Sequence, residues 1–269
     1  MRYPAVAGRF YPNDKKALIK EIETCFTHDI GPGMPSSYGN ERELRAVLAP
    51  HAGYRASGMN AAHAYKKIAE DGLPEVYVII GPDHYGIPYD AAMCGGSYAT
   101  PLGECKVHGI AAKRMRELIP DDPRAHMYEH SVEVQVPFIQ YIDKNAEILP
   151  IIMSDQSQEA AKYLGNAIAE ACEGLDHLIV ASSDLSHYVP KERARSESTD
   201  VLERVCALDV PGMYKTIKDR RITACGFGPI ATAMGSGCSS AALLKYSDSG
   251  DSLGMDDEVV AYASVAFNR

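Results

Sequence analysis

The chain has 269 residues, of which 46% are hydrophobic and 23% are charged, and its net charge is −9. Phosphate backbones repel an acidic chain, so this charge argues against nucleic-acid partners. The length and the even composition predict one globular domain over residues 1–269. No apolar stretch approaches membrane-spanning length, and the N-terminus lacks the apolar core of a signal peptide. We therefore expect a cytoplasmic protein without membrane contact.

The seven cysteines are odd in number and form no CxxC pair. This pattern argues against a disulfide framework and against a structural zinc knuckle. We expect most of these cysteines to be reduced and to pack as small buried side chains.

Short apolar runs rich in β-branched residues recur along the chain, and polar residues follow them. Such runs are typical of strands that are buried on both faces. The expected strands are residues 46–50, 75–82, 146–153, 177–184 and 257–267.

Helical patterns fill most of the intervals between these strands. Leu164, Ile168 and Cys172 recur on one helical face, and Gly174 is a natural stop for that helix. The expected helices are residues 57–70, 157–172, 193–209 and 211–221.

Four segments are less regular. Residues 130–142 alternate like a strand, but Pro137 argues against a central strand and favours a helix. The expectations for the others are a small antiparallel pair within 86–108, a buried small-residue helix within 226–244, and an acidic solvated loop over 247–258.

This order of elements predicts an α/β fold with a central mixed, largely parallel sheet that is flanked by helices. Ligands of such sheets bind at the carboxyl ends of the strands. Exposed apolar segments are expected around Pro88, Tyr89 and Tyr98. They suggest a homo-oligomer interface or ordinary packing.

Four of the nine histidines follow an apolar strand or begin the next element: His51, His84, His130 and His187. Because parallel strands end at one edge of a sheet, we expect these four side chains to meet there. The remaining five are interpreted as structural or surface residues: His28, His63, His108, His126 and His177.

Two aspartates lie beside these histidines. Asp83 and Asp184 would orient an imidazole by accepting its second N–H, or would simply cap helices. The first role is favoured more for Asp184 than for Asp83.

Several common catalytic motifs are missing from the sequence. It contains no phosphate-binding GxxxxGK[ST] loop, no GxGxxG after a strand and no GxSxG nucleophile elbow. A metal site remains, with two neutral imidazoles and one anionic group as ligands. The candidates for the anionic ligand are Glu133, Asp184 and the thiolate of Cys225.

Six motifs in order carry a resemblance to a known family: RYPAVAGRFYP, APHAGYRASG, IIGPDHYG, EHSVEVQVPF, IVASSDLSHY and ACGFGPI. With these motifs the chain resembles the Memo family (mediator of cell motility) and, through it, the type III extradiol dioxygenases. The resemblance implies metal ligands at His51, His84 and Cys225. It also implies an acid/base role for His187 and a pocket role for His130.

The resembled dioxygenases hold Fe(II) with two histidines and a glutamate, and they open catechol rings. Here Cys225 takes the place of the carboxylate. Because thiolate is a soft, strongly donating ligand, this change favours Cu(I), Zn or thiolate-bound Fe(II) and argues against ring opening. The expected cofactor is therefore Fe(II) or Cu(I), with Zn as a third choice.

The resemblance leaves more than one function open. One is a metal-dependent oxidoreductase that acts on an unidentified small molecule, with His187, His130 and Asp184 as catalytic residues. The alternative is a non-catalytic binding protein, which agrees with the family's links to peptide binding and to copper or iron chemistry. It would recognise a peptide as a scaffold, or it would sequester Cu or Fe in the retained pocket.

Overall fold

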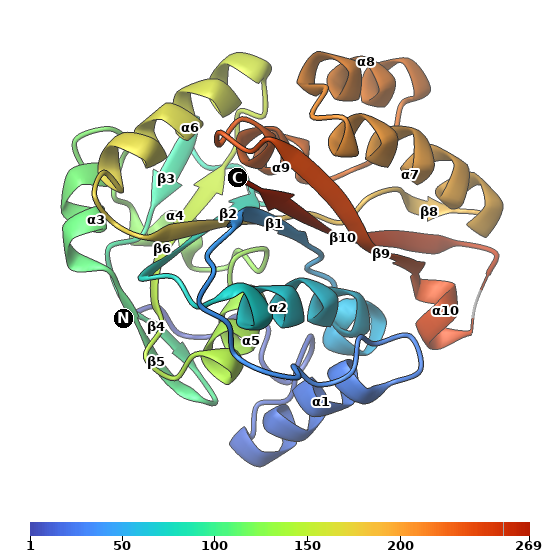
Figure 1. The fold of residues 1–269 in the computed structure, drawn as a ribbon, viewed down its shortest axis with the longest axis horizontal. Helices are drawn as coiled ribbons and strands as arrows, with labels where there is room; N and C mark the ends of the chain where they lie inside the picture. The colour runs from blue at the N-terminus through green and yellow to red at the C-terminus, as the bar shows by residue number, and fades with distance from the viewer. Residues whose placement is uncertain (255) are drawn as a thin grey trace.

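The computed structural model describes residues 1–254 and 256–269. Its described part contains a ten-stranded sheet in the order β4-β5-β6-β2-β7-β1-β10-β8, with β3 added to β6 and β9 added to β10 (Figure 1). The strands are β1 Leu44–Ala49, β2 Val76–Pro82, β3 Ala91–Met93, β4 Tyr98–Thr100, β5 Gly103–Val107, β6 Glu147–Met153, β7 His177–Ser182, β8 His187–Val189, β9 Ser240–Asp248 and β10 Val259–Asn268.

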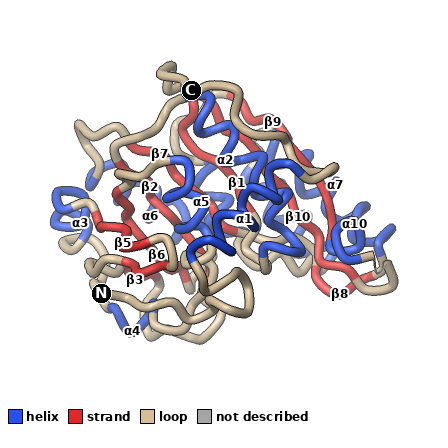
Figure 2. Tube along the Cα trace, turned by 90° about the horizontal axis from the view of Figure 1, so that it is seen from below, coloured by secondary structure: helices blue, strands red, loops and turns tan. Residues whose placement is uncertain are grey.

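The centre of the sheet is parallel. Strands β5, β6, β2, β7 and β1 run parallel to one another, whereas β10 pairs antiparallel with β1, β8 and β9. The carboxyl ends of β1, β7 and β2 are therefore adjacent. Figure 2 traces the strands in red through the middle of the molecule, with loops in tan at their ends. The predicted α/β fold with a mixed, largely parallel sheet is confirmed.

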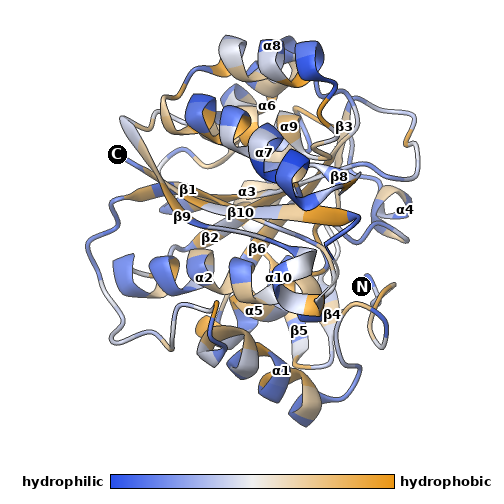
Figure 3. Cartoon of the chain, turned by 90° about the vertical axis from the view of Figure 1, so that its right-hand side faces the viewer, coloured by the Kyte–Doolittle hydropathy of each residue, from blue (hydrophilic) through white to orange (hydrophobic). Residues whose placement is uncertain are grey.

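Helices cover both faces of the sheet, as its edge-on view in Figure 3 shows. Helices α6, α7, α8 and α9 lie on one face, and α1, α2, α5 and α10 lie on the other. Each face has its own apolar cluster of buried side chains. The helices are α1 Lys15–Thr27, the π-helix η1 Tyr54–Gly58, α2 Met59–Asp71, α3 Gly109–Met115, α4 Pro123–His126, α5 Gln135–Ile142, α6 Gln158–Ala171, α7 Lys191–Cys206, α8 Val210–Arg220, α9 Phe227–Met234 and α10 Ser249–Leu253.

The predicted strands and helices are present, with ends that differ by a few residues. The helix predicted within 130–142 is confirmed as α5, although it begins only at Gln135. Pro137 lies in its first turn, where the missing N–H would have no helical acceptor in any case. Within 86–108, β4 and β5 form the expected antiparallel pair, whereas β3 joins β6.

The prediction of a helix within 226–244 is confirmed in the first half of this segment and is wrong in the second half. Helix α9 ends at Met234, and residues from Ser240 onward form β9, which pairs with β10 over its whole length. Gly235 and Gly237 separate the two elements, and Gly237 has a φ of +80°, which suits glycine and stops a helix. Sheet pairing therefore outweighs the helical composition of this segment.

The acidic loop predicted over 247–258 is partly wrong. Ser247 and Asp248 complete β9, and α10 follows, with a capping box between Asp248 and Asp251. Met255, within this prediction, lies outside the described residues.

Tyr98 does not lie in an exposed apolar segment. Its side chain is only 1% exposed, donates to His126 Nδ1 at 2.7 Å, and packs under the Arg2 guanidinium. Pro88 does lie on the surface. In the described ranges, no helix combines the length and apolarity that a membrane crossing requires.

Candidate metal centre

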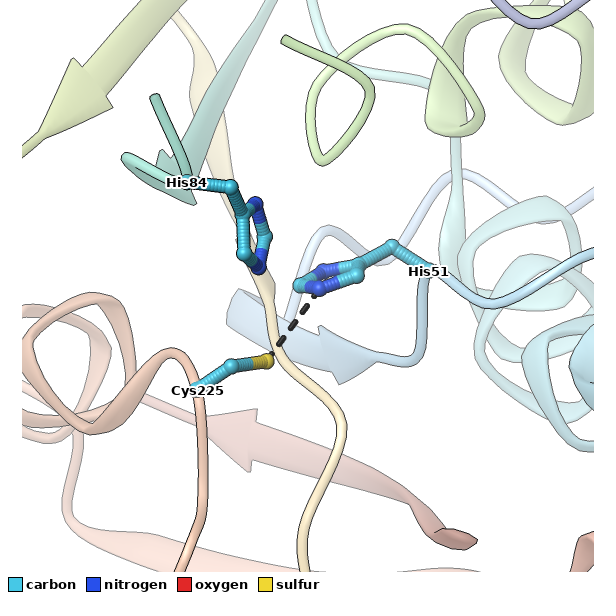
Figure 4. Close-up of side chains that lie close together, drawn as sticks. All are labelled: His51, His84 and Cys225. Carbon is cyan, nitrogen blue, oxygen red and sulfur yellow. Dashed lines mark hydrogen bonds between the residues drawn. The ribbon is translucent and has the colours of Figure 1, made fainter. Parts of the chain in front are cut away.

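Three predicted residues from separate segments bring their side chains together at the carboxyl ends of the parallel strands. His51 follows β1, His84 follows β2, and Cys225 precedes α9. One ligand atom from each lies within 4.8 Å of the other two. Figure 4 shows both imidazoles and the sulfur pointing toward one another.

His51 is buried, with 2% exposure, and is held on both sides of its ring. Nε2 lies 3.2 Å from Cys225 Sγ, and Nδ1 lies 2.9 Å from Ser182 Oγ. Its backbone N–H donates to Asp184 Oδ1 at 2.8 Å. Burial, and then the nearby charge of His84, lower the pKa of His51 to about 3. This imidazole is therefore neutral at physiological pH, as a metal ligand must be.

His84 is oriented by Glu129, a buried carboxylate from a distant segment. Glu129 Oε1 accepts from His84 Nδ1 at 2.9 Å, and Oε2 accepts from the His84 backbone N–H at 2.7 Å. Burial alone would raise the pKa of Glu129, but these bonds, and one from the Ser131 N–H, hold it at about 2. The His84 side chain is 31% exposed, and its Nε2 is left to face the other two candidate ligands.

Two glycines allow the segments of the site to approach this closely. A Cβ on Gly81, in β2, would lie 2.2 Å from Ser131 Oγ, and Ser131 belongs to the segment that carries Glu129. A Cβ on Gly226 would lie 2.5 Å from the Ser182 carbonyl oxygen at the end of β7. Side chains at either position would push Glu129 or Cys225 away from the histidines.

The Cys225 thiol is held close to protein donors. Burial, and then the charge of Asp184, raise the pKa of Cys225, which keeps the thiol protonated when no ion is bound. The Asp184 backbone N–H lies 3.2 Å from Sγ and opposes this shift by donating to the sulfur. Binding of an ion at this sulfur therefore has to displace its proton.

The donor set and spacing fit a transition metal ion. Metal–nitrogen bonds of about 2.0–2.1 Å and metal–sulfur bonds of about 2.3 Å keep ligand atoms within about 4.4 Å of one another. The three atoms here meet this condition within a few tenths of an ångström. Two imidazoles and a thiolate suit Cu(I), Zn(II) and Fe(II).

The family of the chain follows from its sequence as a whole. The Memo-like protein family matches residues 2–266. The chain belongs to the Memo family. It is 41% identical to a MEMO1 family protein of Methanopyrus kandleri, over 100% of this chain and 99% of that protein. It is 42% identical to one of Methanothermobacter thermautotrophicus, over 99% of this chain and 100% of that protein.

A solved structure shares the fold of this Memo protein. The crystal structure of an uncharacterized protein from Escherichia coli K12 superposes with a TM-score of 0.51 at 13% sequence identity. The match covers 83% of this chain and 99% of the other. At this identity the likeness concerns the fold alone.

His130 of this Memo protein lies beside the three candidate ligands. Its ring stacks on His84 with centroids 4.7 Å apart and meets the His51 ring edge-on at 5.5 Å. Burial, and then repulsion from His51, lower the pKa of His130 to about 4. His84, Glu129 and His130 also come within 4.8 Å of one another. Because Glu129 already accepts three N–H groups, we interpret this second group as support for His84.

His187 and Asp184 lie around the same strand ends. His187 Nδ1 lies 2.8 Å from the Thr223 carbonyl oxygen, which leaves Nε2 without a partner among the described residues. A positive charge on His187 would lower the pKa of both His51 and Asp184. Asp184 is buried, which raises its pKa. Its carboxylate receives the backbone N–H of His51, so it orients that histidine through the main chain.

Two candidates from the sequence have other contacts. Asp83 accepts from the backbone N–H groups of residues 85, 86 and 87, so it shapes the loop after β2 and does not orient an imidazole. Glu133, one candidate for the anionic ligand, pairs with Arg2 in the core. It also accepts from Tyr11 and from the N-terminal backbone, which directs it away from the candidate metal ligands.

Sequence reasoning missed Glu129, Ser182 and Gln135. Glu129 directly precedes His130 in the motif EHSVEVQVPF, and that adjacency was the available signal. Ser182 and Gln135 are polar residues at fully buried positions of a strand end and a helix start. Such positions need internal partners.

Proposed function

We propose that this Memo protein binds one thiophilic transition metal ion, Fe(II) or Cu(I), through His51 Nε2, His84 Nε2 and Cys225 Sγ. The convergence of these three atoms within 4.8 Å carries the proposal. Zn(II) is the third candidate ion, because it accepts the same donors. Three protein ligands leave a coordination position open, and the exposure of His84 gives a small molecule access to it.

We further propose a redox function for the bound ion, with a small molecule as substrate. When bound, the ion would supply electron transfer and Lewis acidity. His187 would hold or release a proton at Nε2, since Thr223 anchors its other nitrogen. His130 would line the approach beside His84, and Asp184 would keep His51 in place. Cys225 in place of a carboxylate argues against ring-opening chemistry.

Metal analysis of protein purified without chelator tests the binding step, together with anaerobic titration by Fe(II) and by Cu(I). We expect one equivalent bound per chain. Cys225→Ser should weaken Cu(I) binding by more than about 100-fold, beyond the 10–100-fold typical of residues that only support a ligand. Cys238→Ser is the matched control, because that thiol donates to the α9 backbone. Absence of stoichiometric binding, or equal affinity in Cys225→Ser and wild type, would overturn the proposal.

Turnover separates the redox function from simple metal storage. The loaded protein should consume a supplied reductant under air faster than His187→Ala loaded with the same ion. A loaded wild-type protein that binds tightly without any consumption would contradict the redox function while leaving metal binding intact.

A further inference from the structure

A chain of buried hydrogen bonds runs from the core to the ring of His51. Tyr65 Oη lies 2.6 Å from Gln135 Oε1, and Gln135 Nε2 lies 2.8 Å from Ser182 Oγ. Ser182 Oγ in turn lies 2.9 Å from His51 Nδ1. Tyr65, Gln135 and Ser182 are at most 1% exposed, so the chain has to satisfy its own donors and acceptors.

Two backbone carbonyls determine the direction of every hydrogen bond in this chain. The Pro50 carbonyl oxygen lies 2.9 Å from the Gln135 amide and can only accept, so the Gln135 nitrogen must face it. The Gln135 oxygen is then left to accept from Tyr65. The Ser131 carbonyl oxygen lies 2.6 Å from Ser182 Oγ and also can only accept, so it takes the single hydroxyl proton of Ser182.

This assignment leaves one arrangement for His51. Ser182 Oγ has already donated its proton, so it can only accept from Gln135 Nε2 and from His51 Nδ1. A hydroxyl oxygen has two acceptor sites, and these two donors fill them. His51 Nδ1 must therefore carry the proton, and Nε2 must present its lone pair toward Cys225.

We infer that Ser182 and Gln135 are positioning residues that hold His51 in the Nδ1–H tautomer, so that only Nε2 is available to an ion. The inference deepens the proposed metal-binding function and rests on it, because a fixed tautomer is useful only if His51 binds an ion. The tautomer itself is a property of the protein without metal. In the opposite tautomer, an N–H would point at the sulfur and would have to be removed before His51 could bind an ion.

The test uses the full chain without metal, with ¹⁵N-labelled histidine and long-range ¹H–¹⁵N NMR spectra that distinguish protonated from bare ring nitrogens. The His51 signals are assigned by their loss in His51→Gln. We expect a protonated Nδ1 and a bare Nε2 in the wild type. Ser182→Ala should shift His51 toward the Nε2–H tautomer, whereas Ser182→Thr, which keeps the hydroxyl, should retain the wild-type pattern. Ser264→Ala, another buried serine on a different strand, is the matched control and should also retain it.

Cu(I) affinity supplies a second readout. Ser182→Ala should lower it by about 10–100-fold, as for other residues that orient a ligand. A protonated Nε2 in the wild type would overturn the inference even if Ser182→Ala failed to fold. An unchanged tautomer in folded Ser182→Ala would overturn it as well. A wild-type protein with the expected tautomer that binds no ion would refute the proposed function and leave the positioning network standing.

Discussion

Two side-chain clusters share the chain segment 126–133, and the same residue types have different roles in them. Both contain a histidine, a glutamate and aromatic or imidazole neighbours. The metal-site cluster is His51, His84, Glu129, His130 and Cys225, and the anchor cluster is Arg2, Tyr11, Tyr98, His126 and Glu133. The anchor cluster fixes the N-terminal segment to the core.

The difference lies in the hydrogen-bonding atoms that remain unused. In the anchor cluster, His126 has Tyr98 at Nδ1 and the Ala92 carbonyl oxygen at Nε2. In the metal-site cluster, His84 uses only Nδ1, on Glu129, and keeps Nε2 open toward Cys225. A histidine whose two nitrogens both have hydrogen-bond partners is structural, whereas a histidine with one nitrogen left free can bind an ion.

The largest effect should come from the anchor cluster, by Glu133→Gln. Removing the charge leaves the Arg2 guanidinium buried without its counterion, which should lower the free energy of unfolding by about 3–5 kcal/mol. Urea unfolding measures this loss, with the exposed Glu117→Gln as control. Metal affinity per folded molecule should not change. A large loss of affinity would show that the two clusters are not separable.

The second-largest effect should come from His126, through the dependence of protein stability on pH. Burial lowers the pKa of His126 to about 4, against about 6.5 in an unfolded chain. Between these values the unfolded state binds the proton more readily. The contribution of His126 is therefore complete above pH 6.5 and is lost as pH falls toward 4, by about 3 kcal/mol.

Urea unfolding of the apoprotein across this pH range checks the effect of His126. Stability of His126→Gln should depend less steeply on pH than that of the wild type. Equal slopes would mean that His126 does not resist protonation in the folded protein.

Glu129→Gln should affect binding more than folding. An amide can still occupy the position beside His84, but it lacks the negative charge that strengthens the imidazole as a ligand. We expect Cu(I) affinity to fall by about 10–100-fold. Anaerobic competition titration measures the change. Unchanged Cu(I) affinity in a folded Glu129→Gln variant would show that Glu129, like Glu133 in the anchor cluster, stabilises the fold and does not support a metal ligand.

The smallest effect should come from Asp83→Asn, although Asp83 is adjacent to His84 in sequence. Its carboxylate accepts hydrogen bonds only from backbone N–H groups, and the side-chain oxygen of an asparagine can still accept some of them. Stability should fall by about 1 kcal/mol, with Cu(I) affinity close to the wild-type value. A loss of affinity comparable to that of Glu129→Gln would show that Asp83 acts on the metal ligands after all.

The sequence predicted the parts of the site that follow directly from strand ends. Because β1 and β2 are apolar runs that end in polar turns, the positions of His51 and His84 at one sheet edge could be predicted. The proposed ligand role of Cys225 came from the family resemblance. Glu129 could not be predicted as the partner of His84, because their contact joins residues 45 apart and depends on the close approach at Gly81.

The fold shows the same limit. Strands that are continuous apolar runs were predicted well, whereas the first part of β9, residues 240–244, was predicted as helix, because its composition of Ser, Ala and Leu favours neither structure strongly. Its pairing with β10 decides its conformation, and that pairing is not visible in the local sequence.

The contact between His51 and Cys225 joins residues that are 174 positions apart in the chain. Such a site depends on long-range contacts, because β1, β7 and β2 have to pair and the segment before α9 has to pack against them before the donors meet. An ion would therefore bind after the slow, long-range steps of folding and leave the folding rate unchanged. It would instead slow unfolding, and a chelator would shorten the lifetime of the native state without changing how fast that state forms.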